Sequence, residues 1–211
     1  MTVDFYSFAK GIVKGVLTPF YRIQTIGIEQ FPKEGGVLLC ANHISNLDPP
    51  VIGITAPRPI RFMAKEELFR APVVKTLVKS LHAFPVKRGM NDRQALRTGL
   101  EVLKQGEVLG IFPEGTRSKD GRLKKALPGV GFFALRTDAA VVPCAIVGPY
   151  RPFVPLKVVY GAPVDMAPLR ARKASQKKRP ITLWIISAGC WKSISGHERN
   201  RLFEASLPPP Q

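Results

Sequence analysis

The sequence predicts an α/β fold: a single domain with a mixed, largely parallel sheet flanked by helices, plus an N-terminal amphipathic helix. Short apolar runs of strand length alternate along the chain with segments of helical periodicity. The run at residues 37–41 is continuously apolar, which is typical of a strand buried on both faces of a parallel sheet. Hydrophobic residues make up 45% of the 211 residues, and this share is sufficient for one core.

The first expected element is a helix within residues 3–20. Its apolar side chains recur at helical spacing, while Lys10 and Lys14 fall on another side. The helix either packs on the protein's own core or lies at an anionic membrane surface, and both hold if one face packs and its edge inserts. The apolar stretch at residues 181–191 is shorter than the ~20 residues that cross a bilayer, and no secretory signal peptide is recognisable. Any membrane contact is therefore expected to be peripheral.

The remaining elements alternate between strand and helix. Pro49 suits the first turn of one helix, and Asn91 can cap another. Strands are expected at residues 21–28, 37–41, 60–64, 83–87, 108–112, 140–147 and 156–160. Further helices are expected near residues 72–81, at residues 91–105 and at residues 131–136. The chain then divides into an N-terminal helix (1–20), a main domain (21–175) and an atypical C-terminal tail (176–211).

The composition is strongly basic. Its 32 lysines and arginines exceed its 15 acidic residues, giving a formal net charge of +17. This balance favours anionic partners: nucleic acid, acidic lipid or a phosphorylated substrate. The three cysteines and three histidines are widely spaced without a metal-ligand or disulfide pattern, so neither a metal nor a cofactor is expected. Cys40 and Cys144 lie in apolar runs and are expected to be buried thiols, which fits a reducing cytosolic compartment.

A histidine and an aspartate lie in the loop that follows the expected strand at residues 37–41. His43 and Asp48 are separated by four residues. A carboxylate bonded to one ring nitrogen fixes the tautomer and leaves the other nitrogen to take a proton from a positioned hydroxyl. Asp48 could also cap the helix that begins at Pro49, and the two roles are compatible. No G-x-S-x-G motif is present, so direct attack by a substrate hydroxyl is favoured over an acyl-enzyme route.

A second motif, Phe-Pro-Glu-Gly-Thr-Arg-Ser, occupies residues 112–118 at the end of another expected strand. Gly115 lets the backbone approach a ligand closely, and Arg117 offers a planar fork that can hold phosphate. The alternative is a surface arginine paired with Glu114. The motif therefore predicts a structured turn with an anion-binding side chain.

Two further cations, Lys65 and Arg88, each follow an expected strand. Active sites in α/β folds gather at strand ends, so these cations and Arg117 together predict a phosphate pocket. A basic cluster at residues 170–179 is either a solvated face or a contact for acidic lipid headgroups.

Four blocks of the sequence resemble the glycerolipid acyltransferase family, and within it the bacterial 1-acyl-sn-glycerol-3-phosphate acyltransferases. The matching blocks are Asn-His-x-x-x-x-Asp at residues 42–48, a short apolar strand ending in arginine at 84–88, Phe-Pro-Glu-Gly-Thr-Arg-Ser at 112–118, and an apolar strand with an early proline at 142–146. Four blocks in the family's order make the resemblance specific, and it extends to about residue 173.

The resemblance implies transfer of a fatty acyl group from acyl-CoA or acyl-carrier protein to lysophosphatidate, giving phosphatidate in phospholipid biosynthesis. It implies that His43 is the general base and that Asp48 orients it. It also implies an acceptor-phosphate pocket formed by Lys65, Arg88, Glu114, Gly115, Thr116 and Arg117.

The resemblance further implies a peripheral or monotopic protein on the cytoplasmic face of the cell membrane, with residues 1–20 as the membrane-associating helix. The tail at residues 176–211 departs from the family pattern, and a changed reading frame is one hypothesis for it. Two alternatives remain open: acylation of another lysophospholipid or lyso-lipid, and a non-enzymatic basic module binding nucleic acid or acidic membrane. No nucleic-acid motif is recognisable, so nucleic acid is not an expected partner.

Overall fold

The structure is a computed structural model that describes residues 5–70, 75–76, 78–79, 81–87, 92–118, 127 and 129–171. Its helices are α1 (Phe5–Leu17), α2 (Asp48–Thr55), α4 (Arg93–Lys104), α5 (Gly129–Arg136) and α6 (Ala167–Ala171), with the 3-10 helices η1 (Ile28–Gln30) and η2 (Glu66–Phe69). Its strands are β1 (Arg22–Ile26), β2 (Val37–Ala41), β3 (Ile60–Lys65), β4 (Phe84–Val86), β5 (Val108–Ile111), β6 (Ala140–Val147) and β7 (Pro155–Tyr160).

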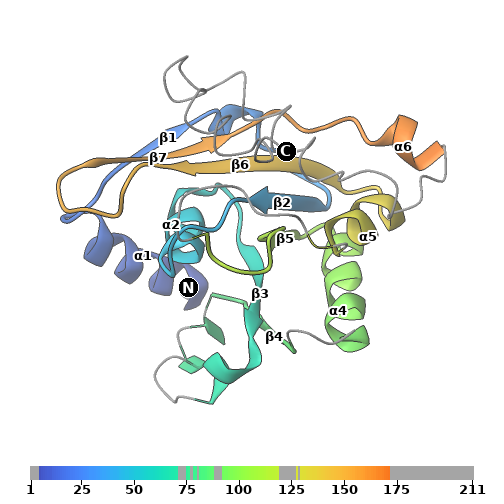
Figure 1. Cartoon of the computed structure of the whole chain (residues 1–211), viewed down its shortest axis with the longest axis horizontal. Coiled ribbons are helices and arrows are strands. Elements are labelled where there is room, and N and C mark those ends of the chain that lie inside the picture. Colours follow the sequence, from blue (N-terminus) through green and yellow to red (C-terminus); the bar gives the residue numbers. More distant parts are fainter. Residues whose placement is uncertain are drawn as a thin grey trace, which may run out of the picture.

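Within the described residues, the strands form one seven-stranded sheet in the order β1-β7-β6-β2-β5-β3-β4 (Figure 1). The strands from β6 to β4 are all parallel, whereas β7 is antiparallel to β6 and parallel to β1. The predicted fold, a mixed and largely parallel sheet with flanking helices, is confirmed. The five mutually parallel strands direct their carboxyl ends to one edge of the sheet, where open α/β sheets bind ligands.

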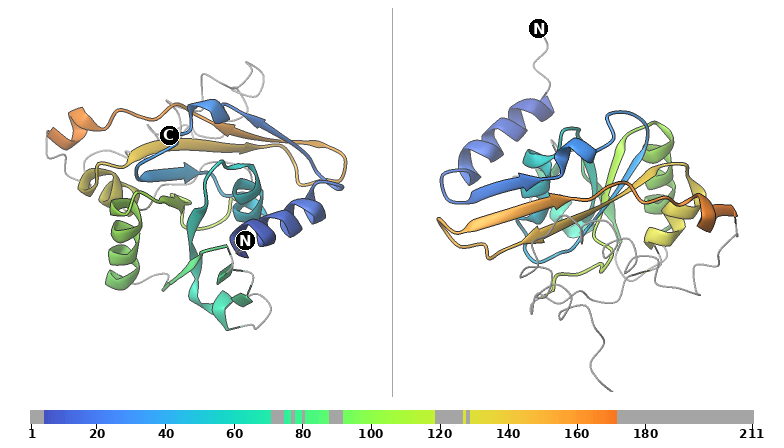
Figure 2. Two further views of the ribbon diagram at one scale, coloured as in Figure 1. Left: turned by 180° about the vertical axis from the view of Figure 1, so that it is seen from behind. Right: turned by 90° about the horizontal axis from the view of Figure 1, so that it is seen from above.

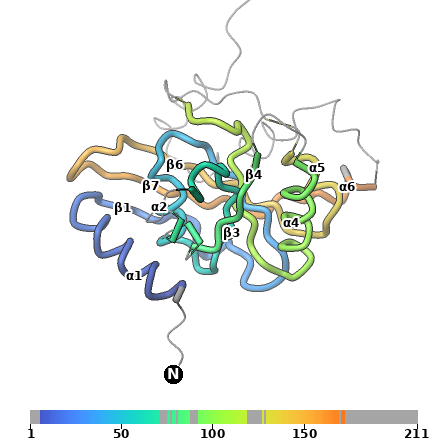
Figure 3. The backbone as a smooth tube through the Cα atoms, turned by 90° about the horizontal axis from the view of Figure 1, so that it is seen from below, coloured from blue at the N-terminus to red at the C-terminus, as the bar shows by residue number. Residues whose placement is uncertain are grey.

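The central strand β2 shows why the sheet has two apolar layers. Val37, Leu39 and Ala41 belong to the core cluster that includes α2 and the end of α1. Leu38 and Cys40 belong to the cluster that includes α4 and α5. These helices lie on the two sides of the sheet in Figures 1 and 3. A strand between two layers has no solvent face, which explains its continuous apolar run.

Helix α1 has a packed side and an exposed apolar side. Among its side chains from residue 6 onward, Tyr6, Ala9 and Leu17 are buried. Lys10 Nζ donates a hydrogen bond to the Ala56 carbonyl at 2.7 Å, which ties α1 to the end of α2. Phe8, Ile12 and Val16 are each more than half exposed. The second view of Figure 2 shows α1 along the outside of the molecule. Among the described helices, none is long and apolar enough to cross a bilayer.

The start of α4 corrects one prediction. The sequence favours Asn91 as the cap, but Asp92 holds that position, and its Oδ1 accepts the Ala95 N–H at 3.0 Å. Its Oδ2 accepts the Lys87 N–H at 2.9 Å, and this bond is the main cause that lowers the pKa of Asp92. Asn91 itself lies outside the described residues.

Other predictions are tested only in part. The observed strands begin and end within about two residues of the predicted ones, and β6 coincides with its prediction. Cys40 and Cys144 are buried thiols that are not joined in a disulfide, as predicted. The tail at residues 176–211, most of the helix expected near 72–81 and residues 172–179 of the basic cluster lie outside the described residues.

Candidate active site

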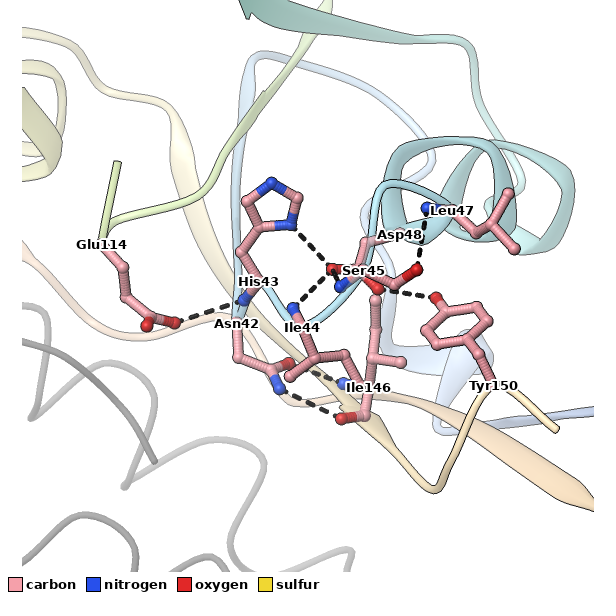
Figure 4. Close-up of polar contacts among 9 residues, drawn as sticks. All are labelled: Asn42, His43, Ile44, Ser45, Leu47, Asp48, Glu114, Ile146 and Tyr150. Atoms are coloured by element: carbon pink, nitrogen blue, oxygen red, sulfur yellow. Dashed lines mark hydrogen bonds and ion pairs between the residues drawn. The ribbon is translucent and has the colours of Figure 1, made fainter. Parts of the chain in front are cut away.

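The loop between β2 and α2 brings the predicted histidine and aspartate into contact. His43 Nδ1 lies 2.7 Å from Asp48 Oδ2 (Figure 4). Asp48 is fully buried, and the His43 side chain is 10% exposed. Since β2 ends just before Asn42 and α2 begins at Asp48, one short loop folds the carboxylate back beside the ring.

Four hydrogen bonds from described residues hold the Asp48 carboxylate. Besides His43, Oδ2 accepts the N–H groups of Ile44 at 2.6 Å and Ser45 at 2.8 Å. Oδ1 accepts the Tyr150 hydroxyl at 2.6 Å. A buried carboxylate needs such partners to offset its lost hydration. The N-cap of α2 is Leu47 without a side-chain cap, so the capping alternative for Asp48 is wrong.

The imidazole ring is fixed by stacking as well as by hydrogen bonding. The Phe112 ring stacks on it with centroids 4.1 Å apart, and Phe62 stacks on Phe112 at 5.7 Å. Gly110 leaves space for this row, because a Cβ there would lie 2.5 Å from the Phe62 ring. The carboxylate only accepts, so Nδ1 carries the proton and Nε2 is the basic nitrogen. Nε2 points away from Asp48 in Figure 4.

The second motif contacts the backbone of the same histidine. Glu114 Oε1 accepts the His43 N–H at 3.2 Å, and the Ser118 N–H donates to the His43 carbonyl at 2.7 Å. Gly115 turns the segment between them with a φ of 64°, a conformation that favours glycine. Two motifs 71 positions apart therefore meet at one residue, because β2 and β5 are neighbours in the sheet.

Asn42 links the loop to β6 on the other side. Its Nδ2 donates to the Ile146 carbonyl at 3.0 Å, and its Oδ1 accepts the Ile146 N–H at 2.7 Å. The side-chain amide thus continues the β2–β6 ladder after β2 has ended. The sequence marks Asn42 as part of a motif but does not show this role, for which an amide is suited because it has one donor and one acceptor end.

Of the residues predicted to form a phosphate pocket, the structure describes some near the candidate site and leaves one undescribed. Thr116 and Arg117 are exposed in the segment that contacts His43. Lys65 ends β3, which belongs to the same parallel set, and its ammonium pairs with Glu67 at 2.9 Å. Arg88 lies outside the described residues. The role of these cations stays a prediction. No group of three acidic, histidine or cysteine side chains in the described part of the chain has metal-site geometry.

Tyr150 is a site residue that the sequence analysis missed. It follows β6, another strand of the parallel set, and its ring packs edge-on against Tyr21 with centroids 5.7 Å apart. Burial is the main cause that raises the pKa of its hydroxyl far above the ordinary value, and the charge of Asp48 adds to the effect. The hydroxyl therefore stays protonated and donates to Asp48. A polar residue after a buried parallel strand is the signal that could have indicated it.

Known proteins share both the sequence pattern and the fold. The acyltransferase family model matches residues 22–147. A 1-acyl-sn-glycerol-3-phosphate acyltransferase of Bacillus subtilis (strain 168) is 34% identical over 146 residues, covering 68% of this chain and 72% of that protein. One of Borreliella burgdorferi is 30% identical, covering 59% of this chain and 51% of that protein. The crystal structure of the 1-acyl-sn-glycerophosphate (LPA) acyltransferase PlsC of Thermotoga maritima has a TM-score of 0.67 and 25% identity, covering 87% of this chain and 76% of that chain.

Proposed function

This chain belongs to the acyltransferase family, and we propose that it transfers a fatty acyl group from acyl-CoA or acyl-carrier protein to the free hydroxyl of 1-acyl-sn-glycerol-3-phosphate. The product is phosphatidate. The observation that carries the proposal is the meeting of the two motifs at His43: its ring bonds Asp48, and its backbone bonds Glu114 and Ser118. The named relatives that act on this acceptor support the choice of substrate.

His43 is the general base in this reaction. Nε2 takes the proton of the acceptor hydroxyl while the hydroxyl oxygen attacks the thioester carbonyl carbon. The Asp48 carboxylate stabilises the imidazolium that forms, through the hydrogen bond to Nδ1. When the tetrahedral intermediate collapses, the carbon–sulfur bond breaks and the imidazolium returns the proton to the departing thiolate. The histidine is regenerated without an acyl-enzyme.

The acceptor phosphate is assigned to the basic side chains at the same edge of the sheet. Arg117 can bind two phosphate oxygens at once, and it lies two residues from the turn at Gly115. Lys65 and Arg88 add charge to this pocket. Because exposed ion pairs are weak, Lys65 can exchange Glu67 for a phosphate oxygen at little cost.

An acyl-transfer assay with the purified full chain in phospholipid vesicles tests the reaction. It uses both thioester carriers and three acceptors: lysophosphatidate, lysophosphatidylcholine and monoacylglycerol. Lysophosphatidate is expected to be the best acceptor by kcat/KM, because only it combines a hydroxyl with a small terminal phosphate. Equal rates with monoacylglycerol would reject lysophosphatidate as the specific acceptor. They would favour the alternative that the protein acylates another lyso-lipid.

His43→Ala tests the assigned base in the same assay. It is expected to lower kcat about 1,000-fold, since general bases contribute about 100-fold to 10,000-fold. His82→Ala is the matched control, because the His82 ring packs on Tyr6 at 5.0 Å and not on the candidate site. Comparable losses in both variants would contradict the assignment.

We further propose that the chain lies on the cytoplasmic face of the membrane as a peripheral or monotopic protein, held by the exposed side of α1. Phe8, Ile12 and Val16 are spaced four residues apart, so they form one row along the helix. Phe20 and Phe153 continue this exposed apolar surface, and the Phe153 N–H donates to the Phe20 carbonyl at 2.8 Å. We choose the cytoplasmic face of the membrane because acyl-CoA and acyl-carrier protein are cytoplasmic.

The charge around this apolar row fits anionic lipid. Lys14 of α1 and Arg151 of the β6–β7 loop are exposed, and each cation near an anionic surface contributes about 1 kcal/mol. Phe153 has a φ of 63°, which a bulky residue rarely adopts. The loop therefore presents an aromatic ring to solvent at a conformational cost, which burial of the ring in lipid offsets.

Flotation with vesicles tests this surface. Ile12→Ser is expected to weaken binding to phosphatidylglycerol-containing vesicles about 10-fold to 100-fold, because one buried isoleucine contributes roughly 1.5–3 kcal/mol. Leu68→Ser is the matched control, since Leu68 is also an exposed apolar side chain but belongs to η2 and not to the α1 row. Equal binding by both variants would refute the assigned surface.

A further inference from the structure

We propose that Tyr150 is a positioning residue for the His43–Asp48 pair, whose hydroxyl holds the carboxylate in the orientation and ionised state that the base requires. The inference depends on the proposed function, because it takes His43 as the base. Tyr150 follows the stretch at residues 22–147 that matches the family model. Its role is therefore inferred from the geometry of this chain.

The two oxygens of Asp48 have different surroundings. Oδ2 accepts three hydrogen bonds, from His43, Ile44 and Ser45. Oδ1 accepts the Tyr150 hydroxyl at 2.6 Å. Bonds at both oxygens fix the rotation of the carboxylate, so Oδ2 stays directed at Nδ1. Because Asp48 is fully buried, solvent is poorly placed to replace the phenol.

The loop that carries Tyr150 is itself held in place. Gly148 begins it with a φ of 117°, and a Cβ there would lie 2.6 Å from the Pro155 carbonyl oxygen. The Phe153 N–H is bonded to the Phe20 carbonyl. The Tyr150 ring packs edge-on against Tyr21. The hydroxyl therefore reaches Asp48 from a preorganised loop.

The chemistry of proton transfer explains what the phenol contributes. When His43 becomes an imidazolium, Asp48 has to remain a carboxylate to stabilise it. A phenol donor stabilises that charge, and burial keeps the phenol protonated, since it raises the pKa of Tyr150. Among the described residues, the other titratable groups around the phenol and the histidine include Tyr21, Cys144 and Glu114.

Tyr150→Phe in the full chain, assayed in vesicles, is the first test. We expect kcat to fall about ten-fold, as for a lost hydrogen bond to a buried charge, with both KM values within about two-fold. We also expect the acid limb of the kcat/KM–pH profile to move to higher pH. Without the phenol, the negative charge of Asp48 is less well stabilised, so the His43–Asp48 pair more readily binds the proton that inactivates the base. Unchanged kcat and an unchanged acid limb would overturn the proposal.

Tyr160→Phe is the matched control for a merely structural effect. The Tyr160 hydroxyl is also buried and also bonds α2, but at Thr55 Oγ1, 2.8 Å away and at the opposite end of the helix from Asp48. It is expected to lower the melting temperature without moving the acid limb. If the two variants lose stability and activity alike with unaltered pH profiles, Tyr150 is only structural.

A gentler change keeps the test valid if Tyr150→Phe folds poorly. 3,5-Difluorotyrosine at position 150 preserves the ring but is a stronger hydrogen-bond donor. It is expected to move the acid limb to lower pH, opposite to the effect of phenylalanine. A limb that moves upward or stays in place overturns the proposal.

NMR of the His43 Nδ1-bound proton separates this proposal from the identity of the acceptor, because it needs no substrate. The resonance is assigned with His43→Ala. It is expected to shift in Tyr150→Phe, because the Asp48 carboxylate that accepts this proton loses its hydrogen bond at Oδ1. An unchanged resonance overturns the role of Tyr150 even if the wild-type enzyme is active. A shifted resonance without acyl transfer to lysophosphatidate removes the proposed reaction and leaves the positioning role intact.

Discussion

The loop at residues 42–48 and helix α1 depart from the usual distribution of side chains in opposite directions. In the loop, Asn42, His43 and Asp48 are polar and buried, and each is hydrogen-bonded within the chain. Along α1, Phe8 and Ile12 are apolar and exposed. Both arrangements are costly without partners. The loop has its partners inside the fold and is suited to chemistry, whereas α1 has an uncovered surface that is suited to a partner outside it.

The largest effect expected from this difference is a loss of turnover in Asp48→Asn. An amide can keep the geometry, with its oxygen toward His43 and its NH2 group donating to the Tyr150 hydroxyl oxygen. It removes the negative charge that stabilises the imidazolium, so kcat is expected to fall about 1,000-fold or more. The measurement is acyl transfer to lysophosphatidate at saturating substrate.

The same variant tests whether the two regions act separately. Asp48→Asn is expected to bind anionic vesicles as the wild type does, while Ile12→Ser keeps its kcat on detergent-dispersed substrate. If the loop variant lost vesicle binding, or the α1 variant lost turnover in detergent, the two regions would be one functional unit and the comparison would be wrong.

A smaller effect is expected on stability when the loop loses an internal partner. Asn42→Ala leaves the buried N–H and C=O of Ile146 without the side chain that bonds both. Each unpaired group costs about 1–3 kcal/mol, so the free energy of unfolding is expected to fall by roughly 2–6 kcal/mol. Urea denaturation measures it. Asn46→Ala in the same loop is the control, because Asn46 is exposed and is expected to matter little.

How far the site is predictable depends on separation along the chain. His43 and Asp48 lie five positions apart in one loop, so their contact follows from local sequence. Tyr150 lies 102 positions from Asp48, and only the pairing of β2 with β6 brings the two together. The stacking of Phe112 on His43 likewise requires β5 beside β2. The sequence predicts which strand ends meet, but not which side chains there touch.

The fold follows the same division between local pattern and geometry. The run at residues 140–147 is long, apolar and bounded, and β6 occupies it without any shift. Asn91 and Asp92 are adjacent and have the same capping chemistry. Asp92 is the residue whose second carboxylate oxygen also accepts the Lys87 N–H, and capping propensity does not include this second contact.

The smallest expected effect is on the free energy of unfolding at alkaline pH. Here the buried phenol of the site, Tyr150, and that of the core, Tyr160, are expected to act in the same way. Burial raises the pKa of Tyr150 and Tyr160 above the ordinary value of 10.0. Above that pH an unfolded tyrosine releases its proton while the folded one keeps it, so the free energy of unfolding falls as pH rises. About half a pH unit above 10, each phenol accounts for a loss of about 0.8 kcal/mol.

Urea unfolding at about pH 9 and about pH 10.5 measures this loss. In Tyr150→Phe and in Tyr160→Phe, the free energy of unfolding is expected to fall less between these two pH values, by about the 0.8 kcal/mol that one phenol contributes. The reason is that each variant lacks one phenol proton that the folded wild type retains. If Tyr160→Phe flattened it and Tyr150→Phe did not, the site phenol would ionise as an exposed one does. The polar groups around Asp48 would then be open to solvent. The loop at residues 42–48 would no longer differ from α1 in having its hydrogen-bond partners inside the fold.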